Sequence, residues 1–572
     1  MAPREWIFLA ALGVALASGA TADEMGGGGP MDVPTASADA DPAGAPAVGP
    51  EPDGPPSAGS SAPAPDAAMI DLSLADAMAL AIENNLNVQI ARHDPLIAWE
   101  DRRIAWGSYD PEAYVEIMRR SVDTPIASAL QANNLIHDDY WEHEGGLRGV
   151  LPVVSTEYGV SFSGDRVRTD RTISSLREQW NSALTFTFRQ PLLRGLYWNE
   201  PWTQVKLSKE VYGQSLEDFR LQLMNVVTGV EAAYWNAVAT DEQQRVAVKS
   251  LEASQKLLEQ TEVQYEVGVV SKVEVVEAEA GVAERELELI TARNEYRKAQ
   301  DDLIDRVLGS NLEAGSRTLV NPIDRPDEYA DYQVDEEEAA RKAMERRPEL
   351  ASLDQAIRQQ EILLTFNRNQ MAPQVDLVAT YGYQGIAGKP CSVNPAATFG
   401  CTPAAAASAA AAVDESFGSS LDDYFTNDGA EVWSVGGVFS IPLGNNAARA
   451  RKRKAQIELR KIKTRRARLV QDIILNVRAS ARELRRSQES IEAAERRRLA
   501  AEEQFRAESI RLEQGESTPF DVLQRERDLV SAEGQKINAF QLYRGAVAAL
   551  ERSQGTILER HNIVVDDARR LR

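Results

Sequence analysis

The sequence predicts a mainly α-helical protein with a smaller β component, arranged as two internal repeats. Two long stretches carry an apolar residue at almost every seventh position, which is typical of coiled-coil helices. Each stretch ends in a similar short turn motif, and the two motifs lie 247 residues apart, which indicates internal duplication. Segments in which apolar residues alternate with small or polar ones supply the β component.

The two turn motifs join pairs of predicted long helices. They read YEVGVVSKVEVVEAE at residues 265–279 and LEQGESTPFDVLQRE at residues 512–526. In each motif a Gly can end one helix in the left-handed conformation, and a hydroxyl residue can cap the next helix ahead of an acidic first turn. The aligned pairs are Gly268 with Gly515, Ser271 with Thr518, Glu274 with Asp521, and Val275 with Val522.

The seven-residue ladders lead into these turns in the same register. Gln244 interrupts the first ladder and Arg498 the second. Since the helix at residues 200–267 would be about 100 Å long at ~1.5 Å per residue, it suits a coiled coil or a helical tube. The ladder residues are Leu216, Leu223, Val230, Ala237, Leu251, Leu258 and Tyr265 in the first, and Val470, Val477, Leu484, Ile491, Phe505 and Leu512 in the second.

Composition excludes some classes of function. The chain has 572 residues and a formal net charge of −24, which argues against a nucleic-acid partner. Beyond the N-terminus no run of eighteen apolar residues occurs, so no transmembrane helix is expected. We find no catalytic constellation, no cofactor motif and no spacing of a defined metal site, so an enzyme is not expected.

The ends of the chain are predicted to lie outside the folded part. Residues 1–22 read as a signal peptide, with Arg4 before the apolar core and an A-x-A cleavage site before Asp23. An N-terminal membrane anchor is the alternative, although the apolar stretch is short for one. Residues 23–67 are rich in Gly, Pro and Ala and are expected to form a disordered linker. Residues 564–572 are expected to form a C-terminal tail.

The folded part divides into a first repeat at residues 68–308, an inter-repeat linker at 309–334, and a second repeat at 335–563. Ser73 and Asp76 form a possible capping box for a helix that we expect to reach about Trp106. The matching helix of the second repeat covers residues 335–370. Pro111 and Pro373 follow these helices at one offset of 262 residues.

Each of these prolines opens a predicted strand, and a second strand closes each half before its long helix. The closing strands, at residues 181–190 and 432–441, end at Pro191 and Pro442, so the four prolines mark strand–helix junctions. The first half has a larger insert, residues 118–180. Its part at residues 146–163 alternates, and whether it adds a hairpin stays open at this point.

The predicted strands allow two interpretations. About ten residues suffice to cross a bilayer when the strand is tilted, with lipid on one face and water on the other. A water-soluble antiparallel sheet with one buried face fits the same alternation. Four strands cannot close a membrane barrel, so several chains would have to share one.

The chain resembles the TolC-like outer-membrane efflux proteins of diderm bacteria over residues 70–563. The resemblance rests on ADAMALAIENN, on FRQPLLRG and FSIPLGNNAARAR at the junctions, and on the two paired turns, in this order. It implies a homotrimer in the outer membrane with a large periplasmic part. Each chain would give four strands to a twelve-stranded transmembrane β-barrel and its helical hairpins to a periplasmic α-barrel.

The resemblance also implies a function. The trimer would be a passive exit duct for efflux or type I secretion, contacting outer-membrane lipid, a periplasmic membrane-fusion adaptor and an inner-membrane pump of the RND or ABC type. A periplasmic coiled-coil adaptor or a scaffold protein is the alternative. Adaptors have one helical hairpin flanked by small β-domains, whereas this chain has two hairpins.

The resemblance assigns site residues to the turns. The periplasmic entrance would be lined by Glu274 and Asp521, followed by Glu277 and Gln524. Crowded carboxylates of three chains would repel one another, raise their pKa values and favour cations. Glu274 and Asp521 also suit the first turn of any helix. The tip residues expected to contact the adaptor are Gly268, Val269, Ser271, Gly515 and Thr518.

One motif departs from the family pattern. Well-known members carry a Tyr three residues before the second turn Gly and an Arg two residues after it, and these residues lock the closed entrance. This chain has Leu512 and Ser517 at those positions, so its closure is expected to use other contacts.

Two further features remain. Cys391 and Cys401 lie in the insert between the second pair of strands, outside the cell in the expected topology, and are expected to form a disulfide rather than to stay free. The basic residues at 449–468 fit either anionic lipid or acidic residues of a neighbouring helix.

Overall fold

The computed structural model describes residues 69–127, 135–171, 174–309, 318–325, 332–391, 401–412, 417–426 and 431–565. They belong to one compact unit, Asp66–Arg572. The predicted signal peptide, the predicted disordered linker and residues 566–572 of the predicted tail lie outside the described residues. None of the described helices is both long and apolar enough to cross a membrane.

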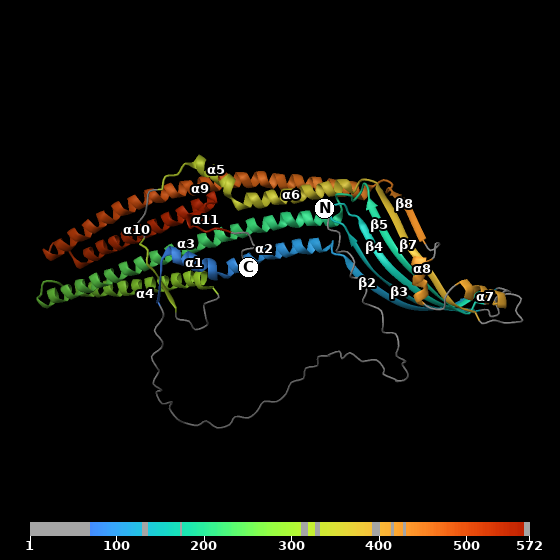
Figure 1. Ribbon diagram of the computed structural model, residues 1–572. Coiled ribbons are helices and arrows are strands. Elements are labelled where there is room, and N and C mark those ends of the chain that lie inside the picture. The colour runs from blue at the N-terminus through green and yellow to red at the C-terminus, as the bar shows by residue number, and fades with distance from the viewer. Residues whose placement is uncertain are drawn as a thin grey trace, which may run out of the picture. The chain divides into compact units, whose positions relative to one another are not determined.

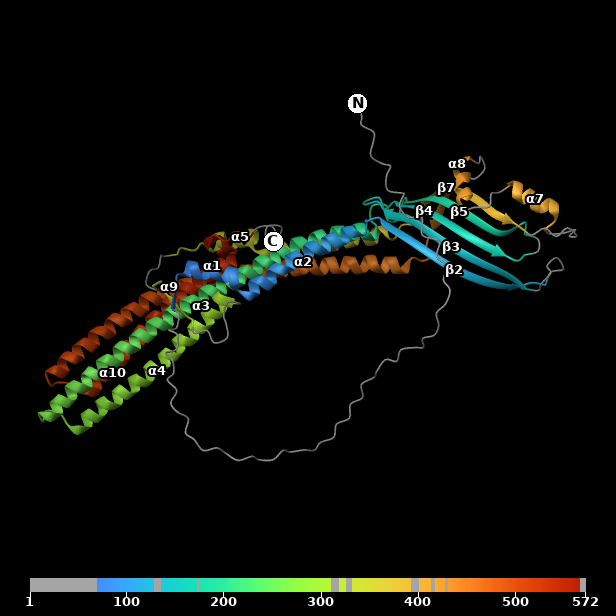
Figure 2. The same cartoon turned by 60° about the horizontal axis from the view of Figure 1, so that its bottom comes forward.

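Two long helical hairpins dominate this unit (Figure 1). The first consists of α3 (Glu200–Glu266) and α4 (Lys272–Leu308), and the second of α9 (Asn446–Glu513) and α10 (Pro519–Gln554). With 67 and 68 residues, α3 and α9 are each about 100 Å long, as the ladders predicted. Both hairpin turns lie at the same end of the unit, and the sheet lies at the other end (Figure 2).

The first helical segment of each repeat is broken, which corrects the prediction of one continuous helix. The segments are α1 (Leu74–Asn84) with α2 (Leu86–Gly107), and α5 (Glu336–Arg346) with α6 (Pro348–Asn369). The predicted capping box of α1 is confirmed. Asn85 is extended and its side chain accepts hydrogen bonds from the first turn of α2. Arg347 precedes Pro348, and the residue before a proline disfavours the helical conformation.

The main sheet has six antiparallel strands in the order β2-β3-β4-β5-β7-β8, whereas the resemblance predicted four. The additional pair, β3 and β4, shows that the insert does add a hairpin, the point that the sequence left open. The first part of β3 reads HDDYWEHE, with charged residues on both faces, so no alternation marked it as a strand. The strands are β2 (Glu112–Pro125), β3 (Leu135–Val150), β4 (Glu157–Thr169), β5 (Leu176–Pro191), β7 (Gln374–Pro390) and β8 (Glu431–Ser440).

A second, two-stranded sheet was not predicted. Strand β1 (Met69–Leu72) pairs in parallel with β6 (Leu319–Pro322), which lies in the segment predicted to be the inter-repeat linker. Three short helices complete the described elements. They are α7 (Pro403–Ala412), α8 (Phe417–Thr426) and α11 (Ile557–Arg560).

The apolar ladders form the core midway along the hairpins. Leu223, Val230 and Ala237 of α3 are buried in one cluster with residues of α1, α4 and α11. Leu484 and Ile491 of α9 are buried in a second cluster against α10. Toward the hairpin turns the first ladder loses this cover, since Tyr265 is 46% exposed. The heptad prediction therefore holds for the middle of both ladders and, at the buried Leu512, for the turn end of the second, whereas the turn end of the first ladder keeps apolar surface exposed.

Candidate functional site

The first hairpin turn brings the predicted tip residues together. Gly268 has a φ of +79°, a conformation that L side chains rarely adopt. The Val269 amide donates to the Gln264 carbonyl at 2.9 Å, which closes the end of α3. Ser271 caps α4, and its hydroxyl donates to a Glu274 carboxylate oxygen at 3.0 Å. The turn is thus ordered by its own backbone and capping contacts.

The second turn repeats this geometry. Gly515 has a φ of +76°, and the Glu516 amide donates to the Arg511 carbonyl at 2.8 Å. Thr518 caps α10, donating from its hydroxyl to Asp521 Oδ2 at 2.7 Å and accepting from the Asp521 amide at 3.3 Å. The two turns are therefore equivalent in structure as well as in sequence.

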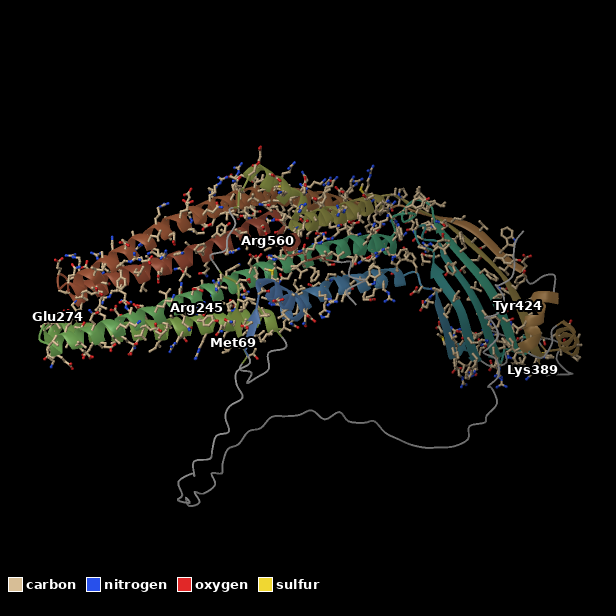
Figure 3. All side chains as sticks on the ribbon, turned by 60° about the vertical axis from the view of Figure 1, so that its left-hand side comes forward. Met69, Arg245, Glu274, Lys389, Tyr424 and Arg560 are labelled. Carbon is tan, nitrogen blue, oxygen red and sulfur yellow. A yellow bond between two sulfur atoms is a disulfide. The ribbon has the colours of Figure 1, made fainter. Side chains whose placement is uncertain are left out.

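The predicted entrance residues lie on the first two turns of α4 and α10, at the free end of the hairpins (Figure 3). Glu274 and Glu277 are half-buried, whereas Asp521 and Gln524 are exposed. Gln524 accepts a hydrogen bond from Arg527 at 3.4 Å. Val269 is 72% exposed, and Val267 and Val273 are exposed too. This end of the first hairpin can offer carboxylates and apolar side chains to a partner.

The first tip is acidic. Its acids, Glu259, Glu262, Glu266, Glu274, Glu277 and Glu279, are balanced within residues 257–280 by Lys272 alone. The corresponding second tip, residues 504–527, is mixed, because arginines on both of its helices accompany the acids. A cationic partner surface would therefore fit the first tip better than the second.

Leu512, one of the two residues that depart from the family pattern, makes an apolar contact between the hairpins. Its side chain is buried in a cluster with Leu257 of α3 and with Val522 and Leu523 of α10. Gly281 of α4 lies so close to Leu523 that a Cβ there would come within 2.9 Å of that side chain. Ser517, the other departing residue, donates from its hydroxyl to Glu508 of its own hairpin. The two hairpins therefore pack through apolar contact just behind the turns.

A buried carboxylate, which the sequence did not reveal, joins the hairpins next to this cluster. Glu526 of α10 is 4% exposed and accepts hydrogen bonds from the hydroxyls of Ser250 at 2.8 Å and Ser254 at 3.0 Å, both on α3. Arg527 forms an ion pair with Glu284 of α4 at 2.6 Å. The spacing of the serines, four residues apart on one helix, was the available signal. We call the contact of Glu526, Ser250 and Ser254 the seam clasp.

Two other titratable groups are tied into the helices. In the second hairpin, the hydrogen bond from Arg498, followed by that from Lys536, lowers the pKa of Glu495 to about 2. Near the middle of the unit, burial raises the pKa of Glu551, which pairs with Arg560 at 3.2 Å (Figure 3). Arg560 also lies 3.6 Å from the buried Glu231 of α3. The two contacts of Arg560, with Glu551 of α10 and Glu231 of α3, connect α11 to both long hairpins.

The six-stranded sheet has one apolar and one polar face. Residues that pair across neighbouring strands point to the same face. One such row crosses β3, β4, β5, β7 and β8 and is wholly apolar or aromatic. It consists of Leu147, Val160, Phe186, Tyr381 and Trp433. An adjacent row on the opposite face consists of Glu112, Arg148, Gly159, Thr187, Thr380 and Ser434.

Charged pairs gather on the polar face where the sheet meets the helices. Arg148 pairs with Glu112 at 2.8 Å and Arg189 with Asp376 at 2.7 Å. They adjoin a cavity of about 480 Å³ whose lining includes Arg148, Arg189 and Thr187. The predicted junction prolines bound the strands here. Pro111 and Pro373 immediately precede β2 and β7, Pro191 ends β5, and Pro442 lies two residues beyond β8.

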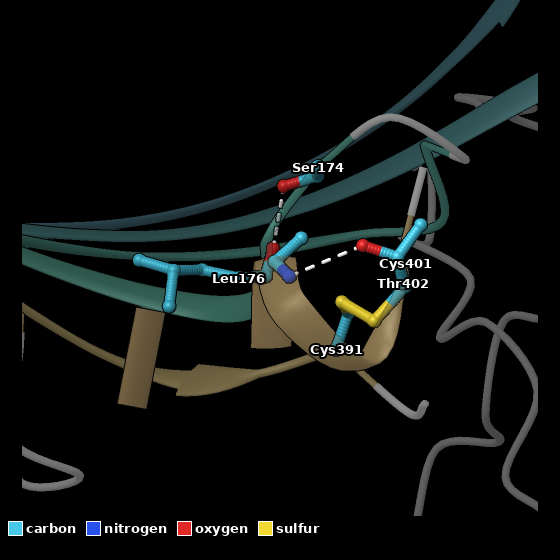
Figure 4. Close-up of a disulfide and its surroundings, with 6 residues drawn as sticks. Ser174, Leu176, Cys391, Cys401 and Thr402 are labelled. Carbon is cyan, nitrogen blue, oxygen red and sulfur yellow. Dashed lines mark hydrogen bonds between the residues drawn. A yellow bond between two sulfur atoms is a disulfide. The ribbon is translucent and has the colours of Figure 1, made fainter. Parts of the chain in front are cut away.

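The structure joins Cys391 and Cys401 in a disulfide (Figure 4), at the end of the sheet far from the long helical hairpins (Figure 1). The Cys391 amide donates to the Ser175 carbonyl at 2.9 Å, which ties the bridge to the start of β5. Helix α8 lies nearby on the apolar face, where the Ser182 hydroxyl donates to the Ser420 carbonyl at 3.0 Å. Within the described residues no group of His, Cys, Asp and Glu is arranged to hold a metal ion.

Comparison with solved structures shows the same fold. The Campylobacter jejuni CmeC outer membrane channel aligns with a TM-score of 0.60 and 13% identity over 87% of this chain and 88% of that one. The outer membrane protein VceC of Vibrio cholerae aligns at 0.57 and 16% identity over 84% and 96%. The open state of the Neisseria gonorrhoeae MtrE outer membrane channel aligns at 0.57 and 15% over 85% and 89%.

Comparison by sequence shows the family. No curated protein matches the chain significantly. The sequence profile described as Outer membrane efflux protein matches twice, at residues 150–309 and 339–556, which together make up more than half of the chain. The two matches fall on the two repeats that the turn motifs predicted. The chain therefore belongs to the family of TolC-like outer membrane efflux proteins.

Proposed function

We propose that this protein is the outer-membrane exit duct of a tripartite efflux or type I secretion system. In this proposal three copies form a transmembrane β-barrel from their sheets and a periplasmic α-barrel from their hairpins. The duct is passive, and an inner-membrane pump of the RND or ABC type delivers substrates to it through a periplasmic adaptor. Solved structures of the same fold include channels described as outer-membrane ones.

The observation that carries the proposal is that two different surfaces lie at the two ends of one unit. Exposed carboxylates and valines lie at the hairpin turns, and a sheet with one apolar and one polar face lies at the far end. A sheet of this kind suits lipid on one side and water on the other. Helices about 100 Å long would reach from such a sheet far into the periplasm.

The hairpin turns are the proposed entrance and docking site. Glu274 and Asp521 of three chains would form carboxylate rings that favour cations, with Glu277 and Gln524 on the next turn. Gly268, Val269 and Ser271 on the first tip, together with Gly515 and Thr518 on the second, would contact the adaptor. The acidic character of the first tip supports a basic surface on the adaptor side.

The test is the mass of the detergent-extracted protein combined with cross-linking of Asp521→Cys. The native cysteines are joined to each other, so the introduced thiol is the reactive one. Arg496→Cys, on the exposed side of α9, serves as the control for random collision. A heat-modifiable trimer in outer-membrane fractions, with cross-links between chains at position 521 and not at 496, supports the proposal. A soluble monomer or dimer would point to the adaptor or scaffold class and overturn it.

A further inference from the structure

The six-stranded sheet ends in two strands with free edges. Among the described strands, β2 pairs only with β3, and β8 pairs only with β7. Every residue of β8 is exposed, and β2 is exposed at nearly every position. Free edges are not tolerated in lipid, and single-chain barrels need about eight strands or more, so this sheet can close only with further copies of itself.

The two free edges are compatible with each other. Strands alternate in direction across the sheet, so β2 and β8 run antiparallel, and β8 of one copy can pair with β2 of the next in the same antiparallel pattern. The apolar row reaches the β8 edge at Trp433, and Val115 and Ile117 near the β2 edge are exposed on the same face. Joining copies in this way would continue one apolar band around a ring.

The width of the sheet matches the width of the helical layer beside it. Helices α2, α3, α6 and α9 pack side by side in this order next to the sheet (Figures 1 and 2). Four helices spaced about 8–10 Å apart span about 32–40 Å. Six strands spaced ~4.8 Å apart and tilted by ~40° span about 38 Å, whereas four strands would span about 25 Å. The hairpin β3–β4 therefore makes the sheet as wide as the helices of its own chain.

We infer that each chain contributes all six strands to the wall of the duct, so that a trimer closes an eighteen-stranded barrel rather than a twelve-stranded one. The inference rests on the proposed function for the number of copies. The barrel would be about 36 Å across between backbones, compared with about 24 Å for twelve strands. Its exit would then be no narrower than the helical tube, and it would admit bulky water-soluble solutes that a twelve-stranded exit excludes.

The lining favours the same class of solute. On the polar face, Ser161, Thr185, Thr187, Thr380 and Ser434 present hydroxyls along β4, β5, β7 and β8. Neutral hydroxyls solvate polar cargo of either charge. The same face also carries acids on β2 and β3, among them Glu116 and Glu144, and the ion pairs Glu112–Arg148 and Arg189–Asp376. A wide exit with a polar lining suits large hydrophilic molecules better than small lipophilic ones.

Cysteine pairs in the full-length protein test the strand order directly. Ser161 lies opposite Thr185 in the six-stranded order, so Ser161→Cys/Thr185→Cys should cross-link within one chain. Glu116 and Ala183 lie in one cross-strand row but are separated by β3 and β4, so Glu116→Cys/Ala183→Cys should not cross-link. The opposite result would mean that β2 pairs with β5 and that β3–β4 stands outside the wall, which would overturn the inference.

A register-preserving deletion tests the width. Ser121 lies in one cross-strand row with Asp139, Arg168 and Glu178. Replacing residues 124–175 with Asn-Gly should therefore join β2 directly to β5 through a two-residue turn, with Ser121 opposite Glu178. Electron cryomicroscopy of both proteins in nanodiscs should show the sheet end narrowing by about one third, from eighteen strands to twelve.

The outcomes separate the two proposals. A trimer with twelve strands in the unaltered protein would overturn the inference and leave the proposed duct intact. A monomer would overturn the proposed duct itself. If the deletion variant does not fold, the strand count of the unaltered trimer and the two cysteine pairs still decide the inference.

Discussion

The seam clasp should control how readily the hairpins separate near the turns. Glu526 is 4% exposed in the native chain and accepts hydrogen bonds from two hydroxyls of α3. The double variant Ser250→Ala/Ser254→Ala should remove both of these donors. A hydrogen bond to a charged group contributes about 1.5–3 kcal/mol, so the pair contributes about 3–6 kcal/mol to the contact. At ~1.4 kcal/mol per tenfold, local opening of α10 should rise by about 10² to 10⁴.

Amide hydrogen exchange of the detergent-solubilised protein measures this opening. Protection should fall at residues 519–535 and stay unchanged in the cluster of Leu484 and Ile491, farther along the second hairpin. Thr261→Val is the matched control, because Thr261 is buried on the same helix but donates to the Leu257 carbonyl of that helix.

A third substitution makes the reasoning refutable. Adding Glu526→Leu to the double variant removes the stranded carboxylate, and replacing both partners by apolar groups is nearly neutral in many proteins. We therefore expect protection to return most of the way. Unchanged exchange in the double variant, or no recovery in the triple variant, would show that the clasp does not hold α10 against α3.

Three further outcomes are expected. Because its pKa falls from 4.5 to about 2, Glu495 stabilises the fold above about pH 4.5 and loses this contribution as the pH drops toward 2. Glu495→Gln should therefore reduce the dependence of the unfolding free energy on pH in that range, by under about 1 kcal/mol for a pair this exposed. Tyr234→Phe should lower the unfolding free energy by about 1.5–3 kcal/mol in a thermal or denaturant titration, since the buried hydroxyl contacts a carboxylate at 2.6 Å. Gly515→Ala should destabilise the second turn by about 1–2 kcal/mol, because Gly515 has a positive φ. Gly534→Ala, within α10 and with open space around it, should stabilise the protein. Equal effects in the same titration would contradict the role assigned to the positive φ.

Much of the helical architecture could be predicted because it follows local rules. The heptad ladders and the Gly-to-hydroxyl turns placed α3 within a residue of its bounds and located the turn ends of α4, α9 and α10. The break at Asn85 was missed because an Asn that caps a helix looks the same in sequence as one within a helix. Only the tertiary contact of its side chain with the Arg306 carbonyl shows which it is.

The sheet and the candidate site were less predictable. Strands beside the junction prolines showed alternation, but β3 carries acids on both faces, and β1 and β6 are four residues each, too short for a periodic signal. The turn residues were found from the repeat. The seam clasp was not found. The spacing of Ser250 and Ser254 puts them on one helix face, but Glu526 lies 276 and 272 residues away from them and nothing local marks it as their partner.

The parallel pair of β1 with β6 has a consequence for the order in which the chain folds. Met69 pairs with Leu319, so this sheet cannot form until the whole first repeat and part of the inter-repeat segment have left the ribosome. Closing a loop of that length is entropically slow to nucleate. The first hairpin, with α1 packed against it, can assemble from contacts within the first repeat, while β1 waits for β6 and joins late.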